Sequence, residues 1–290
     1  MKSRLAASFA ALALALAACS SAATPSPSVA TPTTAPATVA PATTAPATAT
    51  PTAAPASLTI YGASSLKSVL AQAKTTYEAA NPGSMLTIST DSSTALETKI
   101  EQGAPVDVFL SADTTNPQKL VDKNLATGSP TKFAGNLLTI IVPAGNPAGI
   151  QTPADLAKSG VKVIAAGDTV PITKYASQLV ANLAKQPGYP ANFVSKYTAN
   201  IVSKQDNVAA VVAQIELGEG DAGIVYVTDA KTSTKVVTVA VPDAANVPAT
   251  YAGVVVKAST NAAAAQAFLT WFAGPAGQAI LASFGFLPAS

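Results

Sequence analysis

The chain has 290 residues, with 17 Lys and Arg against 15 Asp and Glu, no histidine and a single cysteine. A near-neutral chain without a basic cluster excludes a protein that binds nucleic acid through an electropositive surface. The lack of histidine excludes Ser-His-Asp and Cys-His nucleophiles and the usual zinc sites, so we expect no enzyme of those classes. We also expect no bound cofactor.

Residues 1–19 have the features of a secretion signal. Lys2 and Arg4 precede an uncharged apolar run, residues 5–18, which is too short to span a bilayer comfortably. The run ends in Leu-Ala-Ala-Cys, which looks like a bacterial lipobox, and Cys19 is the only cysteine of the chain. We therefore predict a lipoprotein signal peptide over residues 1–19 and an extracytoplasmic protein that lipid on Cys19 anchors to the cell membrane.

Residues 20–56 are dominated by Ala, Thr, Pro and Ser and contain no charged or aromatic residue. Such a segment cannot bury enough apolar surface to offset the entropy lost on ordering, which predicts disorder. The many prolines favour extended conformations, so the segment is expected to be a semi-rigid stalk that holds a folded domain away from the membrane.

Residues 57–290 are long enough for one large or two small domains. Apolar strand-like runs alternate with helical patterns almost throughout, which predicts an α/β fold with mainly parallel sheets flanked by helices. The predicted strands are 58–61, 86–90, 106–110, 137–142, 161–165, 222–227, 236–241 and 253–256. The predicted helices are 66–80, 94–102, 116–123, 172–184, 208–217, 262–272 and 275–284.

Short polar or uncharged residues stand where several predicted strands end and helices begin. Ser64 and Ser65 follow the first strand, and Ser92 and Ser93 follow the second, with no cation at either turn. A helix N-terminus offers unpaired N–H groups and about half a positive charge, so it can hold an anion without Lys or Arg. Ser and Thr are also good N-caps, which explains any one site alone. Several such helix starts in one cleft would form a neutral-lined site for a small ionised oxyanion.

A series of short motifs runs in order through residues 57–287. The motifs are GASSL at 62–66, DSSTAL at 91–96, IEQGAPVDVFLSAD at 100–113, GNL at 135–137, GIVY at 223–226 and GPAG at 274–277. The series resembles the substrate-binding proteins of molybdate ABC transporters, which have the periplasmic-binding-protein fold. The resemblance implies two lobes, each a mainly parallel sheet flanked by helices, joined by two crossover hinge segments. Residues 57–140 and 251–290 would form lobe 1, residues 141–250 would form lobe 2, and the first crossing would lie near residues 140–143.

The same resemblance implies an oxyanion site made of two serine hydroxyls, a tyrosine hydroxyl and backbone N–H groups. The hydroxyls would come from Ser65, Ser93 and Tyr226, and the N–H groups from Ile172 and Val208. Secondary contributors would be Ser64, Ser92 and Thr94. The expected protein is a monomer that captures molybdate or tungstate through its oxygens, holding no other metal, and delivers it to an ABC transporter permease.

Alternatives to molybdate remain open at this point. A cage of donors suits a fully ionised oxyanion and disfavours a protonated phosphate, but only cavity size would exclude sulfate. Asp91 stands beside Ser93, so its carboxylate either points away from the anion or marks altered specificity. An iron carrier would need an adjacent tyrosine pair, which Tyr226 lacks. Ser64-Ser65-Leu66-Lys67 also fits the S-x-x-K pattern of serine acyl enzymes, without the accompanying S-D-N and K-T-G motifs.

Overall fold

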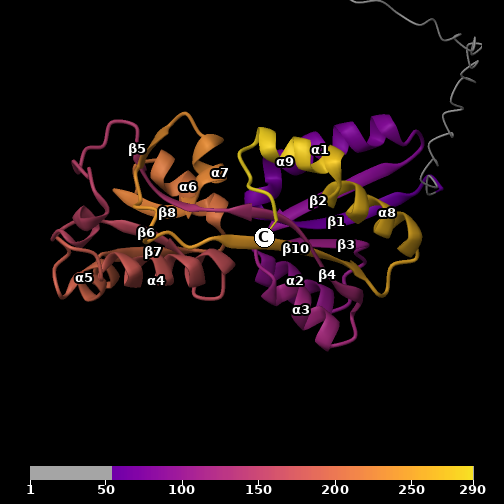
Figure 1. The fold of residues 1–290 in the computed structure, drawn as a ribbon, viewed down its shortest axis with the longest axis horizontal. Helices are drawn as coiled ribbons and strands as arrows, with labels where there is room; N and C mark the ends of the chain where they lie inside the picture. Colours follow the sequence, from indigo (N-terminus) through magenta and orange to yellow (C-terminus); the bar gives the residue numbers. More distant parts are fainter. Residues whose placement is uncertain (1–53, 290) are drawn as a thin grey trace, which may run out of the picture. The chain divides into compact units, whose positions relative to one another are not determined.

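The computed structural model describes residues 54–289. The predicted signal peptide, Cys19 and nearly all of the predicted stalk lie outside these residues. The described part of the chain forms two five-stranded sheets, each flanked by helices, so the expected two-lobed α/β fold is confirmed (Figure 1). No helix within residues 54–289 is long and apolar enough to cross a membrane.

The sheet of lobe 1 has the strand order β2-β1-β3-β10-β4. Its strands are β1 (Ser57–Ala63), β2 (Met85–Asp91), β3 (Val108–Ser111), β4 (Ala126–Asn136) and β10 (Ala249–Val256). The first three pair in parallel, whereas β10 runs antiparallel to both of its neighbours. Helices cover both sides of this sheet (Figure 1). The helices are α1 (Lys67–Ala80), α8 (Ala262–Ala273) and α9 (Pro275–Ser283), opposite α2 (Ser93–Glu101) and α3 (Thr115–Asp122).

The sheet of lobe 2 repeats this mixture of pairings, with the order β7-β6-β8-β5-β9. Its strands are β5 (Leu138–Pro143), β6 (Val163–Ala166), β7 (Ile201–Gln205), β8 (Ala222–Tyr226) and β9 (Val236–Val239). The β6 strand pairs in parallel with β7 and β8, and β5 pairs antiparallel with β8 and β9. The flanking helices are α4 (Pro171–Leu183), α5 (Phe193–Ala199), α6 (Val208–Glu216) and α7 (Val227–Lys231). The sheets are therefore mixed, half parallel and half antiparallel, where mainly parallel sheets were expected.

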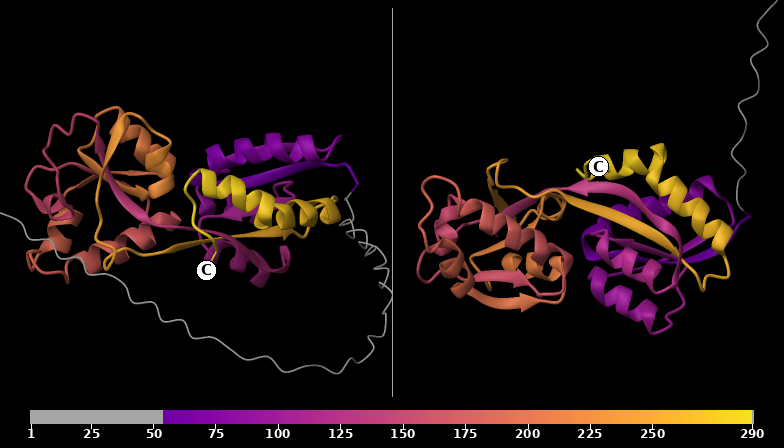
Figure 2. Two further views of the ribbon diagram at one scale, coloured as in Figure 1. Left: turned by 45° about the horizontal axis from the view of Figure 1, so that its top comes forward. Right: turned by 60° about the horizontal axis from the view of Figure 1, so that its bottom comes forward.

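Two crossing segments join the lobes, and Figure 2 shows them running between the two sheets. The first crosses at Leu137, because Asn136 still pairs with Ala249 in the sheet of lobe 1 and Leu138 already pairs in the sheet of lobe 2. The expected crossing near residues 140–143 is therefore wrong. That run belongs to β5 within lobe 2, where Ile140 and Ile141 are buried and paired with both β8 and β9, so the chain does not cross between the lobes there. The second crossing follows Asn246, which hydrogen-bonds to the backbone of Leu138 in lobe 2, and precedes β10, so both lobe boundaries fall a few residues before the expected ones.

The elements missing from the sequence prediction are β4, β7, α5 and α7. The β4 strand contains Gly128, with a φ of 72°, and Pro130, which are turn signals. It forms the edge of its sheet, where a proline costs no ladder hydrogen bond. The sequence pattern alone could not distinguish such an edge strand from a loop.

Candidate functional site

A small cavity lies between the two lobes, at the carboxyl ends of β1, β2 and β8. Lobe 1 contributes Ala63, Ser64, Ser65, Ser92, Ser93 and Ala112 to its lining. Lobe 2 contributes Val170, Pro171, Ile172, Val208 and Tyr226. None of these described lining residues has a charged side chain. The structure thus brings together all five residues expected to bind an oxyanion, together with Ser64 and Ser92.

The helices α2, α4 and α6 all begin at this cavity. The first-turn N–H groups of a helix have no partner within it, and they carry the positive end of the helix dipole. In α4, Pro171 occupies the first turn and Ile172 supplies the next N–H group. In α6, the side chain of Asn207 caps Ala210 and leaves the N–H of Val208 at the cavity. Helix starts from both lobes therefore make the cavity electropositive without a cation.

The serine oxygens at the cavity are already engaged by donors of the protein. Ser93 Oγ accepts a hydrogen bond from the Ala112 N–H at 3.0 Å. Ser92 Oγ accepts one from the Ala95 N–H at 3.2 Å, which makes Ser92 the N-cap of α2. Since each oxygen accepts from a backbone N–H, each hydroxyl hydrogen is left available for another acceptor.

The hydroxyl of Tyr226 is the feature of the cavity that most clearly points to a ligand. The residue ends β8 and is 1% exposed, and its hydroxyl has no hydrogen-bond partner among the described residues. Burial raises the pKa of Tyr226 well above its usual value, so the hydroxyl keeps its proton. A buried hydroxyl without a partner costs free energy unless a ligand accepts its hydrogen bond.

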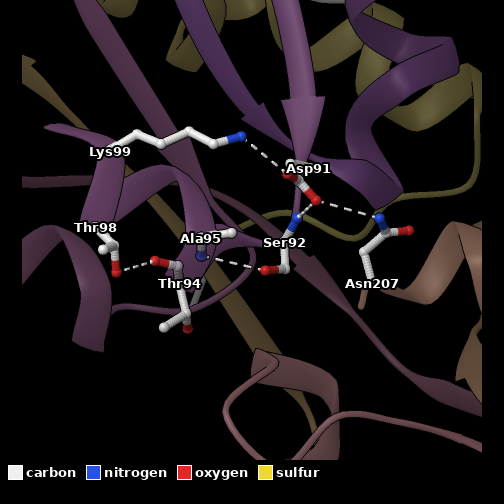
Figure 3. A network of polar contacts seen from close by, with 7 residues as sticks. All are labelled: Asp91, Ser92, Thr94, Ala95, Thr98, Lys99 and Asn207. Carbon is white, nitrogen blue, oxygen red and sulfur yellow. Dashed lines mark hydrogen bonds and ion pairs between the residues drawn. The ribbon is translucent and has the colours of Figure 1, made fainter. Parts of the chain in front are cut away.

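Asp91 does not line the cavity, so the first of its two expected alternatives applies. Figure 3 shows its carboxylate among Ser92, Lys99 and Asn207. The Ser92 N–H donates to it at 2.8 Å, Lys99 Nζ at 3.1 Å and Asn207 Nδ2, from lobe 2, at 3.2 Å. Partial burial opposes ionisation of this carboxyl, but these donors outweigh that effect and hold its pKa below the usual value.

Thr94 is not part of the cavity lining. Its hydroxyl donates to the Thr169 carbonyl oxygen at 2.7 Å, which makes a second hydrogen bond between the lobes outside the cavity. The secondary role expected for Thr94 in holding the anion is therefore not supported by its position.

Lys67 is exposed at the start of α1 and does not line this cavity, although it lines a neighbouring pocket together with Ser64 and Ser65. Within residues 54–289, no group of three or more acidic, histidine or cysteine side chains is arranged to hold a metal ion.

Tyr251 and Asn136 are the site residues that the sequence did not reveal. Tyr251 is fully buried in β10, and its ring centroid lies 5.6 Å from that of Tyr226. Its hydroxyl lies 2.9 Å from Ser65 Oγ and 3.4 Å from Asn136 Nδ2. In sequence, a tyrosine within an apolar strand is typical of core packing, and nothing local signals the contact with Ser65.

A two-lobed α/β fold with a neutral, donor-lined cavity between its lobes defines a binding protein for a small anion. The model of the bacterial extracellular solute-binding protein family matches residues 58–287, and the chain belongs to this family. This membership places the protein outside the cytoplasm.

Relatives of known name refine the comparison. The chain is 34% identical to the molybdate-binding protein ModA of Mycobacterium tuberculosis over 231 residues, which are 79% of this chain and 84% of that protein. The periplasmic molybdate-binding protein of Azotobacter vinelandii superposes with a TM-score of 0.69 at 25% identity, over 80% of this chain and 100% of that one. The expected resemblance is confirmed.

The sulfate-binding protein SubI of Mycobacterium tuberculosis superposes with a TM-score of 0.72 at 20% identity. The match covers 80% of this chain and 87% of that one. This likeness shows the fold alone, so the fold is shared by carriers named for different oxyanions.

Proposed function

We propose that the protein captures molybdate or tungstate between its lobes and delivers the anion to the permease of an ABC transporter. The observation that carries the proposal is the buried Tyr226 hydroxyl, which lacks a partner among the described residues and lines a cavity without charged side chains. The relatives named for molybdate binding support the choice of anion. They are transport proteins, which supports binding without catalysis, and the proposed protein works as a monomer without a cofactor.

The donors around the cavity suit a fully ionised tetrahedral oxyanion. Ser65, Ser93 and Tyr226 would donate through hydroxyls, and Ile172 and Val208 through backbone N–H groups. Hydrogen bonds to a charged acceptor are stronger than neutral ones, and this cavity is shielded from water by both lobes. A protonated oxygen of the ligand would face a donor instead of an acceptor, and that mismatch costs roughly 1–3 kcal/mol.

Thermal unfolding with a panel of anions tests the proposal. Molybdate and tungstate are each expected to stabilise the domain by about 2.7 kcal/mol at a hundredfold excess over the dissociation constant. Sulfate is the alternative ligand, because it is also fully ionised and differs mainly in size. At equal concentration we expect a much smaller shift with sulfate. Equal shifts for sulfate and molybdate would reassign the protein as a sulfate carrier, and no shift with either anion would refute the oxyanion site.

Replacement of Tyr226 by phenylalanine is expected to have opposite effects on stability and on binding. The unliganded domain should gain about 1 kcal/mol, because the variant removes a buried hydroxyl that has no partner among the described residues. Molybdate affinity should fall about ten- to a hundredfold, because a hydrogen bond to a charged acceptor is lost. Denaturant unfolding and isothermal titration measure the two effects separately. A less stable variant with unchanged affinity would mean that this hydroxyl serves the fold and not the ligand.

The membrane anchor is a separate proposal, which rests on the sequence around Cys19. We propose that the protein is a lipoprotein acylated at this cysteine, with residues 20–56 as a stalk. Cys19→Ser is expected to release the protein from the membrane fraction or to block its maturation. A variant that stays as membrane-bound and as fully processed as the natural protein would contradict the anchor.

A further inference from the structure

A chain of buried polar side chains leads from the first crossing segment to the cavity. It begins at Asn136, the last residue of β4, continues through Tyr251 in β10 and ends at Ser65. Asn136 and Tyr251 are 1% and 0% exposed. Buried polar groups in native proteins are hydrogen-bonded, so the direction of each hydrogen bond in this chain can be worked out from the donors and acceptors present.

The amide of Asn136 has only one orientation that satisfies its neighbours. The Leu137 N–H lies 3.0 Å from Asn136 Oδ1, and a backbone N–H can only donate, so the amide oxygen must face it. The amide nitrogen therefore faces the hydroxyls of Thr228, at 2.8 Å, and Tyr251, at 3.4 Å. An amide nitrogen donates and does not accept, so Tyr251 receives a hydrogen bond from Asn136.

Because Asn136 donates to Tyr251, the hydrogen of the Tyr251 hydroxyl must point to a different atom. Among the described contacts of this hydroxyl, only one atom can accept it. That acceptor is Ser65 Oγ, at 2.9 Å. If Tyr251 donates to Ser65, the hydrogen of Ser65 must turn elsewhere. Ser65 lines the cavity and also a neighbouring pocket that contains Asp229, and an anion in the cavity would accept this hydrogen. Burial raises the pKa of Tyr251 well above its usual value, so the tyrosine remains a donor throughout the physiological pH range.

We propose that Tyr251 is a positioning residue, which holds the Ser65 hydroxyl as a donor toward the cavity and so makes the site reject oxyanions that carry a proton. The inference rests on the proposed function, because it concerns the same anion site. Ser93 differs, since its direction is fixed by the backbone N–H of Ala112 and no side-chain substitution can reverse it. At Ser65 the direction depends on Tyr251, and a substitution can therefore release it.

Sulfate and hydrogen phosphate separate the effect of a proton from the effect of size. The two anions are tetrahedra of similar size, and at neutral pH only phosphate carries a proton. We expect the natural protein to bind sulfate at least tenfold more tightly than phosphate at pH 7, in line with the cost of a donor facing a donor. Tyr251→Phe keeps the ring and lets the Ser65 hydroxyl rotate to accept the phosphate proton. In this variant the ratio of sulfate affinity to phosphate affinity should fall about tenfold. Molybdate should bind at least about fivefold more weakly than to the natural protein.

Isothermal titration of four proteins with molybdate, sulfate and phosphate tests the proposal. The proteins are the natural chain, Tyr251→Phe, Ser65→Ala and the double variant. A positioning role requires the effect of Tyr251→Phe on molybdate binding to disappear in the Ser65→Ala background. Tyr77→Phe is the matched control, because Tyr77 is also buried against aromatic rings but lies on α1 away from the cavity. The ratio of sulfate affinity to phosphate affinity in Tyr77→Phe should equal that of the natural chain.

The outcomes separate this inference from the proposed function. A natural protein that binds none of the three anions would refute the function itself. A natural protein that binds molybdate but binds phosphate as tightly as sulfate would overturn the inference even if Tyr251→Phe did not fold. An unchanged ratio of sulfate to phosphate affinity in a folded Tyr251→Phe variant would also overturn it. So would a loss of molybdate affinity on Tyr251→Phe that is equal in the natural and the Ser65→Ala backgrounds.

Discussion

The double variant Ser65→Ala/Ser93→Ala is expected to bind molybdate roughly 100- to 10,000-fold more weakly than the natural protein. Each serine would donate one hydrogen bond to a doubly charged ligand that is shielded from water. Such bonds are worth roughly 1.5–3 kcal/mol, so each single variant should lose about ten- to a hundredfold and the pair the product of both. Titration calorimetry measures the affinities of the natural protein and of the three variants.

A matched control for this experiment is Ser68→Ala, because Ser68 is an exposed serine on α1, close to Ser65 in the chain but absent from the cavity lining. Lys67→Ala provides a charge control, since Lys67 is exposed and also absent from the lining. Both variants should bind as the natural protein does. A loss of binding in Lys67→Ala together with unchanged binding in both single serine variants would refute a cage of neutral donors.

The free energy of unfolding is expected to fall as the pH rises from 5 to 7, and to change little above that. Burial raises the pKa of Asp229 to about 7, although the Tyr226 N–H donates to its carboxylate at 3.2 Å. In the unfolded chain an aspartate has a pKa of about 3.9, so between pH 5 and 7 the folded state holds a proton that the unfolded state has lost. Stability therefore decreases with rising pH, by about 2–3 kcal/mol from this group alone.

Glu97 also lowers the free energy of unfolding as the pH rises. It is buried on α2, and burial together with the nearby carboxylate of Glu101 raises its pKa to about 7. Acids with a lowered pKa, such as Asp155 at about 2, lose their contribution only in more acidic solution and do not oppose this trend.

Asp229→Asn separates the contribution of Asp229 from the others. The amide oxygen can still accept from the Tyr226 N–H, but the side chain no longer ionises. Chemical denaturation at pH 5, 6, 7 and 8 should give a flatter profile for this variant and a higher stability than the natural protein at pH 8. Equal slopes for both proteins would mean that Asp229 is ionised in the folded state throughout this range.

The resemblance to a known family located most of the candidate site, and local sequence signals indicated several of the helix starts around it, whereas long-range contacts were beyond both. The helix starts at Ser93, Ile172 and Val208 follow from capping residues and from the switch between strand and helix patterns. The role of Tyr226 was predicted from the GIVY motif at residues 223–226, which is part of the family resemblance. The contact between Tyr251 and Ser65 joins residues 186 positions apart, and no periodicity or turn signal records such a pairing. The first crossing was misplaced for a related reason, because an apolar run does not reveal which of two sheets it enters.

Two of the hydrogen bonds that join the lobes lie beside the cavity and affect how the protein responds to its ligand. Thr94 to Thr169 and Asn207 to Asp91 hold the lobes together without touching the anion. Together such partly exposed bonds are worth on the order of 1 kcal/mol, which raises the closed fraction of the empty protein several-fold. Apparent affinity scales with the fraction of molecules that are competent to bind. Residues that do not line the cavity therefore set part of the residence time of the anion, and selection could tune its release without altering the donors that recognise its oxygens.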